Sequence, residues 1–443
     1  MSEYQPQLQQ ALSLLRSGDA QQAFRIIRPL LSYPGQVKQP AEFSEVLRAF
    51  ADISMQIAGA EFANLLSEAA RTPTDVKLLY RVGYEMIEYG LSDMAATVLA
   101  HAHHLEPENE AVLNELSAAL EKEMRYAEAR RFLQQAPRLI QHNFLTCYLL
   151  AFNSLMSGDL KTPRRLLPDL WHLQSQDASF AQLTERIALF LGRADVLSGH
   201  TPLDTHDLRG WHLVLTGGLL LHLSPHGFDE PMHGRYAWVQ DTYDLCLLGI
   251  LRVQAVLNAL QIRIPHVWLL PDRNSQILAH ATSHILGVPL KPWAAGGSQA
   301  PGLIVAYDLS QLDGETLVSV RYHRPDQILW SHASCWTKDQ PVSADLTTFL
   351  YQSNTEPWGE RLIVDPESHQ ATSGHADERD PSVIATDLIT SKPAESLPED
   401  EPGLLALMRA SASAAENVLA LLCEEGQRPK QWAGSPVPSA FFR

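Results

Sequence analysis

The chain has 443 residues, with 34 lysines and arginines against 51 aspartates and glutamates, which gives a formal net charge of −17. Its length predicts two or three domains joined by linkers. The negative charge repels nucleic-acid phosphates and anionic lipids, so we expect neither nucleic acid nor a membrane as a main partner. The first ten residues are polar and no run of 18 uncharged apolar residues occurs, which predicts a cytoplasmic protein.

Residues 76–109 follow a pattern of two short helices with a period of 34 residues. Small residues stand where the helices must approach each other, a glycine stands at the turn, and a proline follows the second helix. The residues that carry the pattern are Leu79, Val82, Gly83, Gly90, Ala95, Leu99, Ala102 and Pro107. This pattern resembles the tetratricopeptide repeat (TPR), whose helix pairs stack into solenoids that bind proteins.

The pattern continues on both sides with lower fidelity. Residues 110–143 keep the apolar positions but have Met124 in place of the turn glycine, and Gly158 lies two periods beyond Gly90. Residues 11–27 have the same internal spacing, whereas residues 41–70 are helical but out of register. We therefore predict four or five helix pairs in residues 1–200, stacked into a short solenoid whose concave face receives a peptide or helix of a partner protein.

After this array, strand-like and helix-like segments alternate. The apolar run 211–223 has the period of buried strands, and helical spacing covers residues 243–260 and 275–286. Further strands are expected at 266–270, 302–307, 327–332 and 361–364. The alternation predicts a Rossmann-like α/β domain over residues 201–366, with a mostly parallel sheet whose faces are covered.

Residues 367–402 are rich in Asp, Glu, Ser, Thr and Pro, a composition that predicts a disordered acidic linker. An apolar stripe at helical spacing then predicts an amphipathic helix at 403–426, followed by a tail at 427–443. The expected fold class is therefore multidomain α + α/β: a helical solenoid, a mostly parallel α/β domain, a linker and a C-terminal helix.

Residues 303–316, LIVAYDLSQLDGET, resemble the phosphoribosyl-diphosphate loop of phosphoribosyltransferases, and the resemblance extends at most over residues 211–335. In that family an acidic pair holds ribose hydroxyls and a Thr-Gly-x-Thr loop holds the 5′-phosphate. Here Tyr307 replaces the first acidic residue, Asp308 keeps the second, and Asp313 adds a negative charge near the phosphate cradle. Gly314 and Thr316 are the retained loop residues. The departures favour a repurposed α/β domain over an active transferase, and we assign no catalytic residue.

A second candidate segment follows the strand expected at 266–270. Asp272, Arg273, Asn274 and Ser275 open the next helix, where backbone N–H groups and the arginine can hold a small anion. The alternative is that Asn274 or Ser275 is the helix N-cap and Asp272 a turn residue. If a ligand binds, we expect Arg273 to contact the anion and Asp308 to accept a hydroxyl, because the ends of neighbouring parallel strands converge on one crevice.

No metal site or cofactor is predicted from the histidines or cysteines. His280 and His284 are four residues apart on one helix, and a looser group comprises His222, His226 and His233 near Asp229 and Glu230, but structural or exposed histidines are the favoured interpretation of both. The cysteines, Cys147, Cys246, Cys335 and Cys423, include no CxxC pair and are expected to be reduced and buried.

These observations favour a scaffold protein that binds a protein partner through its helical repeats, with an α/β domain that is structural or binds a small anion. The alternative is an enzyme whose α/β domain takes a ribose-phosphate or nucleotide ligand.

Overall fold

The computed structural model describes residues 4–36, 39–175, 177–226, 232–294, 296–297, 300–324, 326–364, 371–414 and 426–440. The chain divides into two compact units, Met1–Ala188 and Leu189–Arg443. The boundary expected at residue 200 lies inside the second unit, because helix α12 (Ala181–Leu197) continues across the division. Across the described ranges, every helix is too short or too polar to cross a membrane.

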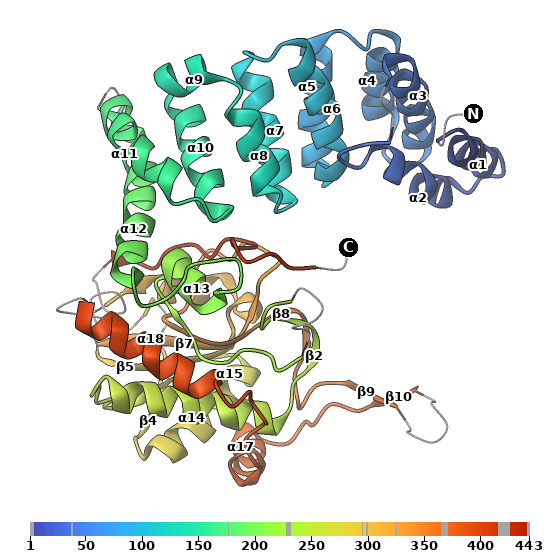
Figure 1. Cartoon of the computed structure of the whole chain (residues 1–443). Helices are drawn as coiled ribbons and strands as arrows, with labels where there is room; N and C mark the ends of the chain where they lie inside the picture. The colour runs from blue at the N-terminus through green and yellow to red at the C-terminus, as the bar shows by residue number, and fades with distance from the viewer. Residues whose placement is uncertain are drawn as a thin grey trace. The chain divides into compact units, whose positions relative to one another are not determined.

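The first unit is a run of helices joined by short turns (Figure 1). Its members before α12 are α1 (Gln5–Arg16), α2 (Ala20–Leu31), α3 (Pro40–Ile57), α4 (Ala60–Arg71), α5 (Val76–Glu88), α6 (Ser92–Leu105), α7 (Glu110–Lys122), α8 (Tyr126–Leu133), α9 (Pro137–His142), α10 (Phe144–Met156), α11 (Lys161–Gln174) and the short 3-10 helix η1 (Ala178–Phe180). Helices α1 and α2, α3 and α4, α5 and α6, α7 and α8, and α10 and α11 pack as pairs. The helical N-terminal part is thus confirmed, while the relation to tetratricopeptide proteins stays a resemblance.

The turn residues explain how the pairs form. Gly90 and Gly158 end α5 and α10 with φ angles of 73° and 83°, a left-handed conformation that glycine adopts without strain. Met124, which occupies the corresponding turn after α7, keeps that conformation with a φ of 55°. The repeat geometry is therefore maintained even where the glycine is lost.

The second unit is built on a seven-stranded sheet in which every strand pair is parallel. Its order is β1-β8-β7-β5-β3-β4, and β2 also pairs with β8. The strands are β1 (Leu219–Leu220), β2 (Tyr236–Gln240), β3 (Val267–Leu269), β4 (Leu290–Pro292), β5 (Gly302–Asp308), β7 (Gln327–Cys335) and β8 (Leu346–Thr355). The expected mostly parallel sheet is therefore present. Two small antiparallel pairs accompany it, β9 (Arg361–Val364) with β10 (Ala371–Gly374), and β6 (Tyr322–His323) with β11 (Gly426–Gln427).

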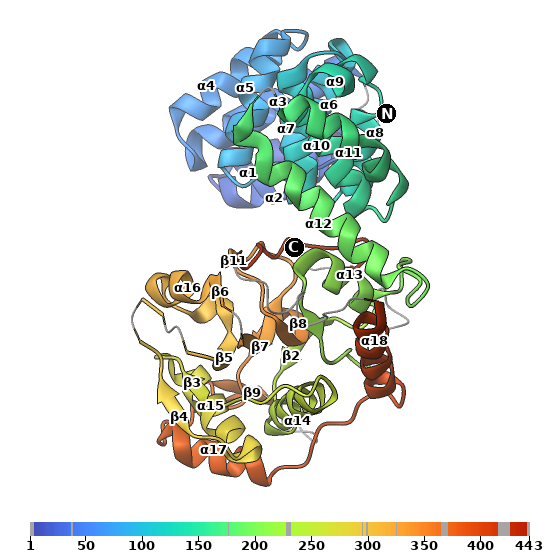
Figure 2. The same cartoon turned by 90° about the vertical axis from the view of Figure 1, so that its left-hand side faces the viewer.

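Helices cover the sheet. Figures 1 and 2 place α14 (Tyr243–Ala259), α15 (Arg273–Leu286) and α17 (Pro381–Thr390) on the same side of it. Helix α15 packs on β3 and β5, and α17 packs on α14 and α15. The other helices of this unit are α13 (Leu208–Thr216), η2 (Leu309–Gln311), α16 (Gly314–Val320) and α18 (Asp400–Ala414).

The apolar run 211–223 is not a strand over most of its length, which corrects the expectation. Residues up to Thr216 belong to α13, which Asp207 caps at its start and the left-handed Gly217 ends, and only Leu219–Leu220 form β1. Every residue of α13 is buried. A helix buried on all sides has no exposed face, so its apolar spacing does not distinguish it from a buried strand.

The C-terminal part is more ordered than its composition indicated. Within the segment expected to be a disordered linker, the structure has β10 and α17, and α17 buries Ile384, Ala385 and Leu388. The expected helix begins at Asp400, and residues 415–425 lie outside the described part of the chain. In the expected tail, the buried Arg428 forms an ion pair with Asp345 at 2.9 Å. The composition averaged over residues 367–402 gave no indication of the few apolar residues that α17 buries.

Candidate functional site

The predicted ligand crevice lies where the strand order reverses. After β3 the chain adds β4 at one edge of the sheet. It then returns to the other side of β3 with β5, from which it continues to β7 and β8. Leu269 of β3 pairs with Val305 of β5, so Asp272 and Asp308, three residues further along each strand direction, stand at the same end of neighbouring strands. Such a reversal is the usual ligand site of an open parallel sheet. The structure therefore brings the two predicted aspartates to one edge.

Asp272 is the N-cap of α15, because its Oδ1 accepts a hydrogen bond of 2.9 Å from the Ser275 N–H. The helix N-cap is thus Asp272, not Asn274 or Ser275 as the sequence analysis expected. Burial raises the pKa of Asp272, and its Oδ2 has no hydrogen-bond partner among the described residues. Ser275 in turn accepts the Tyr307 N–H through Oγ at 2.9 Å, which fixes α15 on β5.

Arg273 and Asn274 point into the neighbouring loops. The Arg273 guanidinium donates to the carbonyl oxygens of Asp377 and Arg379, at 2.8 and 2.6 Å. The Asn274 amide donates to Gln311 at 2.9 Å and accepts from the Trp358 indole N–H at 2.6 Å. The Arg273 contacts connect α15 to the segment before α17, and those of Asn274 connect it to Gln311 and to the loop after β8. A role for Arg273 in anion binding stays a prediction.

Asp308 is buried with both carboxylate oxygens engaged. Oδ1 accepts from the Ser310 N–H at 2.8 Å and from its hydroxyl at 2.7 Å, and Oδ2 accepts from the Tyr351 hydroxyl. Burial raises the pKa of Asp308, and these hydrogen bonds oppose that rise. Asp313 caps α16 and accepts both the N–H and the hydroxyl of Thr316, at 2.9 and 2.7 Å, while Gly314 is the first residue of that helix.

A cavity of about 370 Å³ adjoins this edge. Its lining residues are Pro271, Trp293, Gly296, Asp313, Glu315, Thr316 and Ser319. Among the described residues, the polar part of this lining consists of two carboxylates, two hydroxyls and an indole N–H, with no cationic side chain. A carboxylate repels a phosphate, so the cavity suits a hydroxylated or cationic molecule better than the anion we expected.

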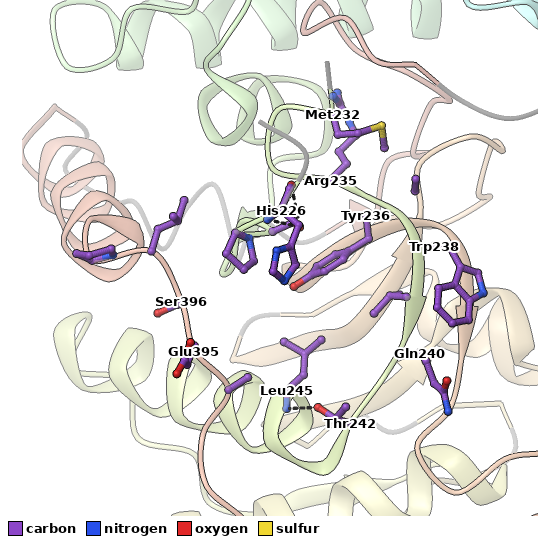
Figure 3. A pocket seen from close by; sticks show the side chains of 17 residues that line it. His226, Met232, Arg235, Tyr236, Trp238, Gln240, Thr242, Leu245, Glu395 and Ser396 are labelled. Carbon is purple, nitrogen blue, oxygen red and sulfur yellow. Dashed lines mark hydrogen bonds between the residues drawn. The ribbon is translucent and has the colours of Figure 1, made fainter. Parts of the chain in front are cut away.

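A larger groove of about 740 Å³ runs along β2 (Figure 3). Consecutive residues from Arg235 to Gln240 form one wall, and residues 394–398 lie across from them. Tyr236, Val239 and Leu245 provide apolar surface, whereas His226, Gln240 and Glu395 are polar lining residues. Trp238 is 59% exposed at this wall. The sequence analysis did not predict this groove.

A buried polar cluster lies beneath the start of α14. Asp241, Cys246, Tyr307 and His332 are each at most 1% exposed. The Oδ2 atom of Asp241 accepts from the Tyr307 hydroxyl at 2.7 Å, lies 3.1 Å from Nε2 of His332 and accepts from Sγ of Cys246 at 3.4 Å. Burial and the adjacent carboxylate raise the pKa of both the Cys246 thiol and the Tyr307 hydroxyl. Without a cation beside it, the thiol is therefore protonated at physiological pH and unsuited to act as a nucleophile.

Sequence reasoning did not select this cluster, although two signals were present. Tyr307 occupies the position where the phosphoribosyltransferase resemblance implies an acidic residue, and His332 interrupts a buried strand. Three members of the cluster, Asp241, Cys246 and His332, are the one group of possible metal ligands found among the described residues.

The histidine groups singled out from the sequence have other surroundings. His222 contacts Asp400 at 2.9 Å through Nδ1 and the Tyr236 hydroxyl at 3.0 Å through Nε2, which places it in the network that holds α18. The ring of His233 packs against that of His206 at 5.1 Å. Asp229 and Glu230 lie outside the described residues, as does Cys423, while the other three cysteines are buried free thiols.

Comparison with models of known protein families gives no match. Comparison with curated proteins gives none either.

Proposed function

We propose that this protein binds a protein partner through the face formed by α5 and α7. The observation that supports the proposal is a group of tyrosine and charged side chains on this face. Helices α5 and α7 open consecutive helix pairs and pack against each other directly. Tyr84 is 44% exposed on α5, and Tyr80 is partly exposed one turn earlier on the same helix.

Electrostatic coupling indicates that these side chains share one surface. Burial and then the Glu115 carboxylate and Tyr84 raise the pKa of Tyr80. The pKa of Glu115 is also raised, mainly by burial; the Lys122 charge opposes this rise and the Glu88 carboxylate adds to it. Tyrosine offers a large, rigid contact area at low conformational-entropy cost, which suits protein recognition. The carboxylates of Glu88 and Glu115 would favour a partner segment that carries a basic residue beside its apolar anchor.

A paired-variant binding experiment tests this proposal. The full-length protein is cross-linked in the cells that produce it, captured partners are identified by mass spectrometry, and the purified partner is titrated by calorimetry. Tyr80→Ala/Tyr84→Ala should weaken binding at least tenfold, as expected for hot-spot aromatics. Trp171→Ala on α11, where the tryptophan is similarly exposed at 43%, is the matched control and should bind normally. Equal binding by both variants would exclude this face as the recognition surface.

A second candidate function is small-ligand binding at the 370 Å³ cavity beside β3 and β5. This function is favoured because the cavity lies where the strand order reverses, which is the usual ligand site of an open parallel sheet. A ligand that binds only the folded state raises the melting temperature by mass action. Thermal shifts with nucleotides, phosphoribosyl diphosphate, polyols and amines would test it, with Trp293→Ala as the lining variant. No shift at millimolar concentrations of any of them would argue against this function.

A further inference from the structure

We propose that Asp241, Cys246 and His332 form a structural site for a zinc-type divalent cation. The three residues come from separate elements of the second unit: Asp241 follows β2, Cys246 lies in the first turn of α14, and His332 is on the central strand β7. One ligand atom from each lies within 4.8 Å of the others. Side chains far apart in the sequence thus converge on one point.

The distances match the edges of a zinc coordination tetrahedron. Zinc bonds of about 2.0–2.2 Å to nitrogen or oxygen and about 2.3 Å to sulfur imply separations of about 3.4 Å between a nitrogen and an oxygen ligand and about 3.6 Å between an oxygen and a sulfur ligand. The observed separations from Asp241 Oδ2 are 3.1 Å to His332 Nε2 and 3.4 Å to Cys246 Sγ. These two edges are within a few tenths of an ångström of the expected values, and the third, between Cys246 Sγ and His332 Nε2, lies within 4.8 Å.

The donor set also selects the ion. Thiolate and imidazole ligands favour zinc over magnesium or calcium, which prefer oxygen donors. A thiolate and a carboxylate together neutralise a divalent cation, so the loaded site carries no net charge. This matters because all three side chains are at most 1% exposed, and an uncompensated buried charge is costly.

The surrounding contacts suit a coordination centre. The other Asp241 oxygen, Oδ1, accepts the Thr242 N–H at 2.7 Å, which orients the carboxylate. The Tyr307 hydroxyl donates to Asp241 Oδ2 at 2.7 Å and accepts from the Asn354 amide at 3.1 Å, which further orients the carboxylate. The ligating nitrogen of His332 is Nε2, which faces Asp241 Oδ2, while Nδ1 has no hydrogen-bond partner among the described residues.

The site would join the start of α14 and the end of β2 to the centre of the sheet. Because all three ligands are buried, a substrate does not reach the ion, so the ion serves stability rather than chemistry. It enters during folding or through a transient opening.

Metal analysis of the full-length protein tests the assignment. The protein is produced without a metal-binding tag in zinc-supplemented medium, and its metal content is measured by mass spectrometry. We expect about one zinc per chain, since three ligands bind one ion. A portion unfolded with a chelator and refolded with cobalt alone should show thiolate-to-cobalt charge-transfer absorption, which requires a cysteine ligand.

Cys246→Ser should abolish the charge-transfer band, and His332→Gln should lower zinc affinity at least tenfold. Cys335→Ser is the matched control, because Cys335 is another buried thiol on the same strand as His332 but lies outside the cluster. It should retain the zinc and the band. If a variant fails to fold, the wild-type refolding measurement decides. Wild-type protein that is isolated without zinc and takes up none on refolding would overturn the proposal, as would full retention of zinc in both ligand variants.

Discussion

Replacing Gly83 with alanine should destabilise the helical unit, although alanine is the better helix former. A Cβ atom added at Gly83 would lie 2.4 Å from Cγ and 2.6 Å from Cδ2 of Leu99, well inside van der Waals contact. Leu99 is fully buried, so a shift of its side chain must displace other side chains of a close-packed core. Such overpacking costs about 1–3 kcal/mol, and the gain in helix propensity offsets about 0.5–1 kcal/mol. The expected net loss is roughly 1–2 kcal/mol.

Gly192 on α12 provides the matched control, because a Cβ added there meets no atom within 4 Å. Gly192→Ala should therefore stabilise its helix by about 0.5–1 kcal/mol. The two units need not unfold together, so hydrogen exchange of α5 and α6 amides should be followed in the full chain beside urea unfolding. The Gly83→Ala penalty should largely vanish in a Leu99→Ala background, which removes the clash. An unchanged penalty there, or a stabilising Gly83→Ala in the wild-type background, would refute the close-packing argument.

Two substitutions and one labelling experiment test other parts of the structure. Met124→Gly should raise the free energy of unfolding by up to about 1 kcal/mol, because a left-handed non-glycine residue is strained; a lower urea midpoint would show that the methionine contacts dominate. Asp400→Asn should cost about 3–5 kcal/mol by leaving the buried Arg209 charge without its carboxylate partner, measured as faster hydrogen exchange in α18. Burial raises the pKa of Asp400, but hydrogen bonds and charges from His222 and Arg209 lower it overall. The stability that Asp400 contributes is therefore complete above the unfolded-state pKa and is lost as the pH falls through the lower folded-state pKa. Acid-induced release of α18 that is the same in Asp400→Asn as in the wild type would contradict this. Burial raises the pKa of Cys147 to about 12, so a thiol reagent at neutral pH should label it only on unfolding, and rapid labelling of native protein would count against the buried site.

The helical unit could be predicted from sequence because its determinants are local. Gly83, Gly90 and Gly158 stand at fixed spacings, and each spacing corresponds to one close contact or one turn in the structure. Even Met124 keeps the backbone conformation that the period required. A pattern that repeats over a few tens of residues can be recognised without long-range contacts. Binding by the array would instead depend on surface side chains, which the pattern does not specify.

Local patterns were insufficient where burial was complete or apolar segments were short. Helix α13 has no exposed face, so nothing in its spacing marked it as a helix. Helix α17 buries three side chains at positions 384, 385 and 388 within an otherwise polar stretch, and the Asp380 N-cap with Pro381 was its clearest signal. Composition averaged over a long window removes such signals because it discards position.

The candidate sites show a further limit, since topology places strand ends but not side-chain directions. Asp272 and Asp308 could be brought to one edge by reasoning about neighbouring parallel strands alone. Successive strand residues point to opposite faces, however, and Tyr307 and Asp308 follow that rule. Tyr307 reaches Asp241 beneath α14, while Asp308 turns to Tyr351. One strand end therefore contributes to two separate environments, and the residue that departed from the family pattern belongs to the buried cluster rather than to the predicted crevice.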